Sequence, residues 1–191
     1  MAVKDYTTKV APAFDGLLPD GERLLAAAPL VQDPGTTEDA SVRDELIDLL
    51  DPTILVGLGT FPGNAVQQAV WGRAVIGPPG TQGRLLHAAI GAVTSPAVAV
   101  TDRRLLIVEI DVVPRAQSGP GKWFGPSDQV ARERYGVDKV AILGAVAAPA
   151  GALRRGRLLA GFRDGSGCML VCSPPSLAPA VVEAIGAPRG E

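Results

Sequence analysis

The chain contains a single histidine and two cysteines, and this limits the catalytic chemistry that it can support. A serine hydrolase needs a base and an orienting acid beside its nucleophile, and no Gly-x-Ser-x-Gly motif occurs. His87 lies between Leu86 and Ala88 in a helical pattern, which favours a partly buried packing residue over a general base. We therefore expect no enzyme of this kind; because acids are plentiful, an enzyme with an unrecognised site stays an alternative.

Both cysteines lie on one apolar segment. If that segment is a strand, four residues at ~3.3 Å each place Cys168 about 13 Å from Cys172, whereas a disulfide requires Cα atoms within ~7 Å of each other. The spacing also lacks the second ligand pair of a metal site, and His87 is far away in sequence. We expect two reduced core thiols and neither a metal nor another cofactor.

A glycine-rich segment, Val75–Leu86, has some similarity to the phosphate loop of nucleotide-hydrolysing enzymes. That loop needs four residues between its glycines, followed by Lys and Ser or Thr, which reach the phosphates and Mg²⁺. Here five residues separate Gly77 from Gly83, and Arg84-Leu85 follow. The segment is better interpreted as a Gly-Pro turn between two helices.

A segment rich in Gly and Pro contains one cation followed by two aromatic residues: Lys122, Trp123 and Phe124. Large aromatic side chains beside a cation are typical of an anchor for a protein partner or a membrane interface. An equally good interpretation is a loop folded back so that Trp123 covers the mouth of a barrel.

Five arginines are candidates for a basic patch near predicted turns. In one interpretation they bind an anionic ligand. In the other they are solvated residues at the ends of strands, and arginines near turns more often have this second role. These residues are Arg103, Arg104, Arg154, Arg155 and Arg157.

Composition indicates one globular domain. The chain has 191 residues, of which 47% are hydrophobic and 20% charged, as in ordinary folded domains. A net charge of −2 and a pI near 5.5 argue against a nucleic-acid-binding protein. No signal-peptide core and no transmembrane segment are recognisable, so we expect a cytoplasmic protein, and the preference for Arg, Ala, Gly and Pro is typical of a GC-rich bacterial genome.

Two hairpins are predicted in the C-terminal half. In the segment Arg157–Cys172, Asp164-Gly165 supplies a tight turn between β-prone runs, with Leu158, Ala160 and Phe162 facing one side. A second hairpin joins Pro96–Val100 to Leu105–Ile110 through the polar residues 101–104, where Asp102 is suited to bind backbone amides ahead of it. Val140–Val146 is predicted to be a further strand, preceded by an exposed loop around 119–126.

Helices are predicted at the C-terminus and in a middle segment. Ser176 is a suitable N-cap for a helix ending at Gly186, and Leu177, Val181 and Ile185 form a stripe that should dock on the sheet. Residues 41–91, rich in Gly and Ala, are interpreted as a helical insertion. Its helices are predicted over Asp44–Leu50, Asn64–Val75 and Arg84–Ile90.

Three segments resemble bacterial pleckstrin-homology-like (PH-like) domains, and they occur in the expected order: LPDGERLLAAAP from Leu18, AVTDRRLLIV from Ala99 and GRLLAGFRDGS from Gly156. The resemblance covers Pro19–Val31 and Pro96–Ile185. It implies an α+β fold: a bent antiparallel sheet, forming a partly open barrel, with a C-terminal helix plugging one end. The chain would be one domain over 1–191, with 41–91 inserted between the first two strands.

The resemblance also bears on two open points. In Glu22–Val31 the alanines favour a helix, whereas Pro29 and the resemblance favour a first strand, which we predict. Lipid-binding members of the family carry a basic motif in the loop that joins their first two strands. Here the insertion replaces that loop without a matching lysine-rich pattern, so inositol phosphate binding is not carried over to any residue.

These observations favour a non-catalytic interaction domain that binds a protein partner or associates with itself. The small residues of 41–91 would permit close helix packing at such a surface. Peripheral binding of anionic lipid through Lys122, Trp123, Phe124 and nearby arginines is the alternative, followed by an enzyme with an unrecognised site.

Overall fold

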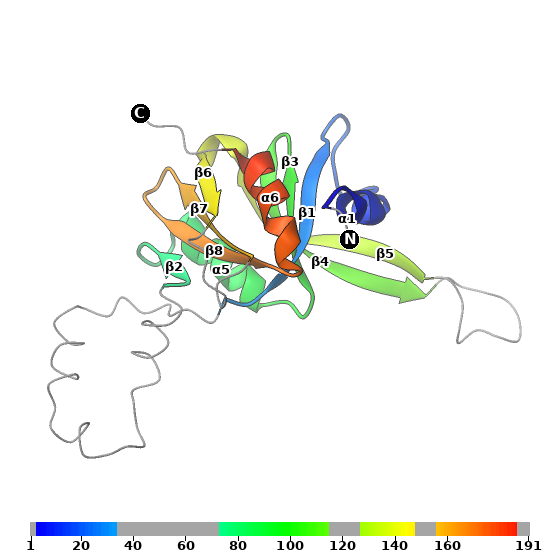
Figure 1. The fold of residues 1–191 in the computed structure, drawn as a ribbon, viewed down its shortest axis with the longest axis horizontal. Helices are drawn as coiled ribbons and strands as arrows, with labels where there is room; N and C mark the ends of the chain where they lie inside the picture. The colour runs from blue at the N-terminus through cyan, green and yellow to red at the C-terminus, as the bar shows by residue number, and fades with distance from the viewer. Residues whose placement is uncertain (1–2, 34–72, 115–126, 148–155, 187–191) are drawn as a thin grey trace, which may run out of the picture.

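The protein is an α+β structure built on one antiparallel sheet of eight strands (Figure 1). It is a computed structural model and describes residues 3–33, 73–114, 127–147 and 156–186. The strands are β1 Leu24–Val31, β2 Val75–Ile76, β3 Pro96–Thr101, β4 Arg104–Pro114, β5 Ser127–Asp138, β6 Ile142–Ala147, β7 Arg157–Phe162 and β8 Gly167–Cys172. The helices are α1 Val3–Val10, α5 Gln82–Gly91 and α6 Ala178–Ile185, with 3-10 turns η1 Ala11–Phe14, η3 Lys139–Ala141 and η5 Pro175–Leu177.

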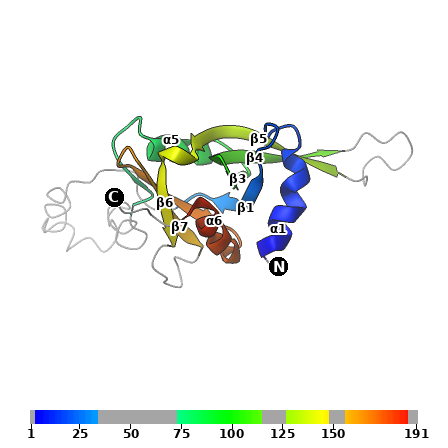
Figure 2. The same ribbon diagram turned by 90° about the horizontal axis from the view of Figure 1, so that it is seen from above.

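The strands follow the order β5-β4-β3-β1-β8-β7-β6, and β2 pairs with β8 outside this path. Within the described residues the end strands β5 and β6 do not pair with each other, so the sheet is open. Inward side chains from both halves of the sheet meet in one core, which α5 and α6 complete with Leu86, Ile90, Val181 and Ile185. Figure 2 shows the two helices lying over different parts of the sheet.

The β7–β8 hairpin confirms the prediction from the sequence. Its turn contains Gly165 at a φ of +79°, a conformation that glycine adopts without steric cost. Leu158, Ala160 and Phe162 are fully buried, as the period of two predicts.

The β3–β4 hairpin is also present, but with a shorter turn than predicted, since Thr101 and Arg104 belong to the strands. The hydroxyl of Thr101 accepts hydrogen bonds from the amides of Arg103 and Arg104 at 3.1 and 2.8 Å. Asp102 instead accepts from the amide of Arg23 at 3.0 Å, so it joins the hairpin to the residue before β1.

Helix α6 docks on the sheet as predicted. Leu177, Val181 and Ile185 are buried in the core, and Gly186, at a φ of +101°, ends the helix. The N-cap position is Leu177 and not Ser176, because the turn η5 precedes α6. The strand predicted over Val140–Val146 corresponds to β6, and the predicted first strand to β1.

Besides the short strand β2, two larger parts of the fold were not predicted from the sequence. The α1–η1 segment covers the outer face of β1, β3, β4 and β5 through Val10, Ala13 and Phe14. This face carries the alanines Ala27, Ala97 and Ala99, whose small side chains let a helix approach the sheet closely. The second is β5, which pairs with β4 along its whole length.

The insertion is described only from residue 73 onward. The helix predicted over Arg84–Ile90 is confirmed as α5, whereas Val75 lies in β2 and not at the end of a helix. The Gly-Pro turn therefore joins a strand to a helix. The predicted helix Asp44–Leu50, and residues 64–72 of the other, lie outside the described residues.

Both cysteines are free and buried, as predicted. Burial raises the pKa of each thiol from 9.0 to about 12, which lowers the thiolate fraction at pH 8 about a thousandfold. We expect Cys168 and Cys172 to react with a disulfide reagent at pH 8 only as fast as the protein unfolds, and rapidly once denaturant is added. Rapid labelling of the native protein would contradict their burial.

Candidate functional site

A groove in the described surface lies between α1 and α6, over the first half of β1. Figure 2 shows the two helices on either side of this strand. The groove has a volume of about 820 Å³. It is lined by Thr7, Thr8, Leu25, Lys139, Pro179, Ala180, Glu183 and Ala184.

The groove lies where, among the described residues, one edge of β1 has no neighbouring strand. On one side β1 pairs with β3 from Leu24 to Pro29, but on the other it pairs with β8 only at Leu30 and Val31. The amide of Ala27 donates to the hydroxyl of Thr7 in α1 at 3.1 Å, so a side chain takes the place of a strand. A bulge in the pairing between Leu24 and Ala26 accompanies the exposure of the intervening Leu25, 43% of which is accessible.

The lining is apolar with a charged border. Leu25, Pro179 and Ala180 provide the apolar part, while Lys139 and Glu183 carry opposite charges. The ammonium of Lys139 donates to the carbonyl of Ala184 at 3.0 Å, close to the C-terminal end of α6, where a cation is stabilised. The groove thus offers apolar contact together with one fixed cation and one anion.

A second hollow, of about 490 Å³, shares Lys139 with the groove. It lies on the other side of the last turn of α6 and is lined by Asp102, Lys139, Val140, Ile142, Leu143, Arg163, Ile185 and Gly186. The two hollows therefore border the same ammonium group.

Of the site residues predicted from the sequence, the structure describes Arg103 and Arg104; Lys122, Trp123, Phe124, Arg154 and Arg155 lie outside the described residues. Arg103 is exposed in the β3–β4 turn. Arg104 forms ion pairs with Glu22 and Glu133, both at 3.0 Å, and its charge is therefore balanced within the fold.

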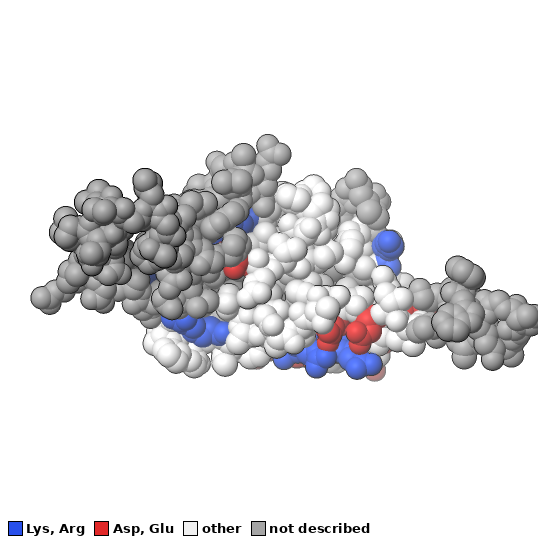
Figure 3. Space-filling view, turned by 90° about the horizontal axis from the view of Figure 1, so that it is seen from below, with Lys and Arg blue, Asp and Glu red and all other residues white. Residues whose placement is uncertain are grey.

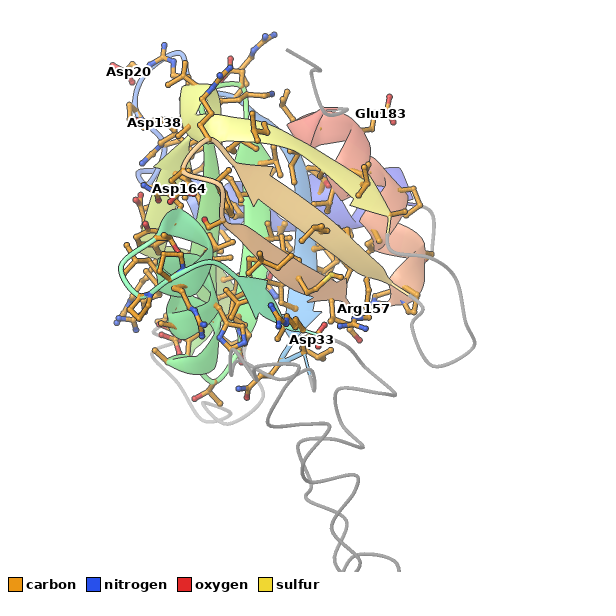
Figure 4. All side chains as sticks on the ribbon, turned by 90° about the vertical axis from the view of Figure 1, so that its left-hand side faces the viewer. Asp20, Asp33, Asp138, Arg157, Asp164 and Glu183 are labelled. Carbon is orange, nitrogen blue, oxygen red and sulfur yellow. The ribbon has the colours of Figure 1, made fainter. Side chains whose placement is uncertain are left out.

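Arg157, the remaining member of the possible basic patch, is buried far from Arg103. It binds both carboxylate oxygens of Asp33, at 2.7 and 2.9 Å, and only 2% and 1% of the two side chains are exposed. Arg103 lies at the start of β1, beside Gly21, and Asp33 follows its end, so the length of the strand, about 26 Å, separates them. Figure 4 shows Asp33 and Arg157 together, at the end of the sheet opposite Asp20 and Asp138.

The exposed charges on β4 and β5 are also paired. Arg132 pairs with Asp111 at 3.2 Å, and Arg134 binds Glu109 through two nitrogen atoms. At the lower right of the face in Figure 3, basic and acidic side chains lie next to one another. On β4 and β5, therefore, the basic side chains Arg132 and Arg134 are balanced by acids.

The N-terminus of α5, which follows the glycine-rich turn, is filled by groups of the protein itself. Asp164 accepts from the amide of Gln82 at 2.7 Å, and Ser166 accepts from that of Gly83 at 2.9 Å. Burial alone would raise the pKa of Asp164, but hydrogen bonds from Ser166 and Gln82 lower it below its ordinary value. A carboxylate therefore occupies the place at which a phosphate would bind.

His87 is half-buried on α5, as predicted. Burial lowers the pKa of His87 and Arg84 lowers it further, against an opposing effect of Asp33, so the imidazole is neutral at pH 7. Within the described ranges no three His, Cys, Asp or Glu side chains gather as metal ligands would. Nor does any helix described there have the length and apolar character needed to cross a membrane.

Comparison with family models, curated proteins and solved structures finds no significant match to this chain. The candidate site therefore rests on its own geometry.

The groove residues were not predicted from the sequence. They come from α1, β1, η3 and α6, and no local pattern joins these segments. Lys139, one of only four lysines in the chain, is the one residue whose rarity could have drawn attention to it.

Proposed function

We propose that the chain is a PH-like, non-catalytic interaction domain that binds a segment of a partner protein in the groove between α1 and α6. The open antiparallel sheet with its C-terminal helix supports the family proposal. The functional proposal is carried by the exposed apolar floor at Leu25. It is flanked by two helices, over an edge of β1 that has no neighbouring strand in the part of the chain that the structure describes.

A polypeptide segment suits this groove for two reasons. Its lining of Leu25, Pro179 and Ala180 matches apolar side chains, while the opposite charges of Lys139 and Glu183 match a ligand that carries both polarities. The adjoining hollow at Lys139 extends the site around the end of α6, which favours an extended chain over a compact small molecule.

Peripheral lipid binding has less support from the described residues. Arg104 and Arg157 both form ion pairs with acids. Lipid-binding members of the proposed family carry a basic motif between their first two strands. Here that connection includes α5, and a carboxylate of the protein itself, Asp164, binds the N-terminus of this helix.

A display selection with random twelve-residue peptides on the immobilised protein tests the peptide-binding proposal. We expect enriched peptides whose affinity falls at least about tenfold in Leu25→Glu and Ala180→Glu, because each places a charge on the apolar floor. Val112→Glu serves as the matched control: Val112 is 62% exposed on β4 and does not line the groove.

Thermal unfolding of each variant establishes that it is folded. Failure to enrich any peptide would reject the proposal, and so would peptides that bind Leu25→Glu and Ala180→Glu as tightly as the parent protein.

A further inference from the structure

We propose that the bound segment carries an acidic side chain, Asp or Glu, whose carboxylate binds Lys139 in the hollow between β6 and the end of α6. This inference rests on the proposed peptide-binding function and specifies the chemistry of the ligand. It starts from the position of Lys139, which alone among the described residues lines both the groove and the adjoining hollow.

The ammonium of Lys139 is held in place but not saturated. It carries three N–H donors, and its hydrogen bond within the described part of the chain goes to the carbonyl of Ala184. That bond fixes the position of the charge, and the remaining donors can bind a ligand oxygen. A pre-positioned cation loses less conformational entropy on binding than a free lysine side chain.

Charge in the hollow favours an anion. Arg163 lies in the same lining and donates to the carbonyl of Val140 at 2.8 Å. The acid in the lining, Asp102, already accepts from the amide of Arg23 and pairs with its guanidinium at 3.3 Å. The charge of this acid is thus balanced by an arginine outside the lining, and Lys139 is the cation that favours an anionic ligand in the hollow.

The ligand carboxylate is expected to come from a side chain and not from a chain terminus. Recognition of a terminal carboxylate relies on a nest of free backbone amides, but the amides of four lining residues are already used within the fold. Asp102 donates to Arg23, Lys139 to Arg103, Arg163 to Ala141 and Gly186 to Val182. A terminal carboxylate could not use these four amides, whereas the ammonium of Lys139 can donate to the carboxylate of an acidic side chain.

Glu183 sets the direction in which the segment lies. It borders the larger groove, where it disfavours an acid by like-charge repulsion. The acidic residue is accordingly placed in the smaller hollow, and the apolar residues of the segment lie over Leu25 and Ala180.

The test uses the peptide enriched with highest affinity by the parent protein, together with a copy in which each Asp or Glu is replaced by Asn or Gln. We expect the neutral copy to bind the parent protein about tenfold more weakly, as a charge-assisted hydrogen bond implies. Lys139→Met should bind both peptides with equal, reduced affinity, and Lys139→Arg should restore the preference for the acidic one. Adding 0.5 M salt should reduce the preference only where the cation is present.

The outcomes separate the two proposals. If Lys139→Met binds the acidic peptide as tightly as the parent protein while Leu25→Glu does not, the groove is a peptide site and the carboxylate inference is wrong. An acidic peptide that loses affinity when only its C-terminus is amidated would also overturn the inference. If the parent protein binds no peptide at all, both proposals fail.

Discussion

Replacing Gly83 by Ala is expected to lower the free energy of unfolding by about 1–3 kcal/mol. Gly83 lies in the first turn of α5, where the helix crosses β8, and a Cβ atom there would lie 2.6 Å from the carbonyl oxygen of Gly167 and 2.8 Å from its carbon. Backbone atoms cannot rotate away, so the helix itself must shift. That shift would also disturb the hydrogen bond from the amide of Gly83 to Ser166.

Gly91→Ala is the matched control, since Gly91 ends the same helix and its Cβ would meet only a side-chain atom of Gln32, at 3.8 Å. This variant should be neutral or stabilised by up to about 1 kcal/mol, because alanine favours a helix more than glycine does. Denaturant unfolding of both variants measures the difference. Equal stability of the two would show that α5 does not approach β8 as closely as the structure has it.

Replacing Arg157 by Met is expected to destabilise the protein by about 3–5 kcal/mol, the cost of removing one partner of a buried ion pair. Asp33 would lose both hydrogen bonds from the guanidinium while its carboxylate stays in the interior. This pair joins the residue at which the chain leaves β1 to the first residue of β7, so its loss should loosen that end of the sheet.

Arg132→Met is the comparison, because Arg132 pairs with Asp111 at the surface, with 62% and 36% of the two side chains exposed. We expect a loss of about 0–1 kcal/mol for this exposed pair. The double variant Asp33→Leu with Arg157→Met should be more stable than Arg157→Met alone, since it removes the buried charge together with its partner. An Arg157→Met protein as stable as Arg132→Met would contradict the burial of the pair.

Several local features could be predicted because neighbouring residues specify them. Asp164-Gly165 between two apolar runs defines the β7–β8 hairpin, and the four-residue spacing of Leu177, Val181 and Ile185 defines the buried face that continues into α6. In both cases the side-chain period and the turn chemistry act within a dozen residues.

Strand β5 shows where such patterns fail. Its buried residues Ala131 and Val137 lie on opposite faces of the sheet although six positions separate them. The pairing with β4 shifts between Ile107 and Val108, and this bulge interrupts the alternation of faces. Arg132, Glu133 and Arg134 in its centre give the segment a polar appearance. The strand is stabilised by its complete pairing with β4, which no local pattern reveals.

The cap of α5 is a second example. Thr81 occupies the N-cap position, but its hydroxyl donates to the carbonyl of Pro78. The helix amides are bound by Asp164 and Ser166 from the distant β7–β8 turn. The sequence could identify the helix, but not the groups that hold its N-terminus.

By itself, then, the sequence determined the antiparallel hairpins, the C-terminal helix and the two reduced thiols, because hydrophobic period and turn residues act over short distances. Tertiary structure alone decided that Arg104 and Arg157 are held by acids rather than exposed as a basic patch. It also decided that Leu25, Lys139 and Glu183 share one groove. These outcomes depend on which distant segments pack together: the groove forms because α1 and α6 lie on either side of a strand edge that no described strand pairs with.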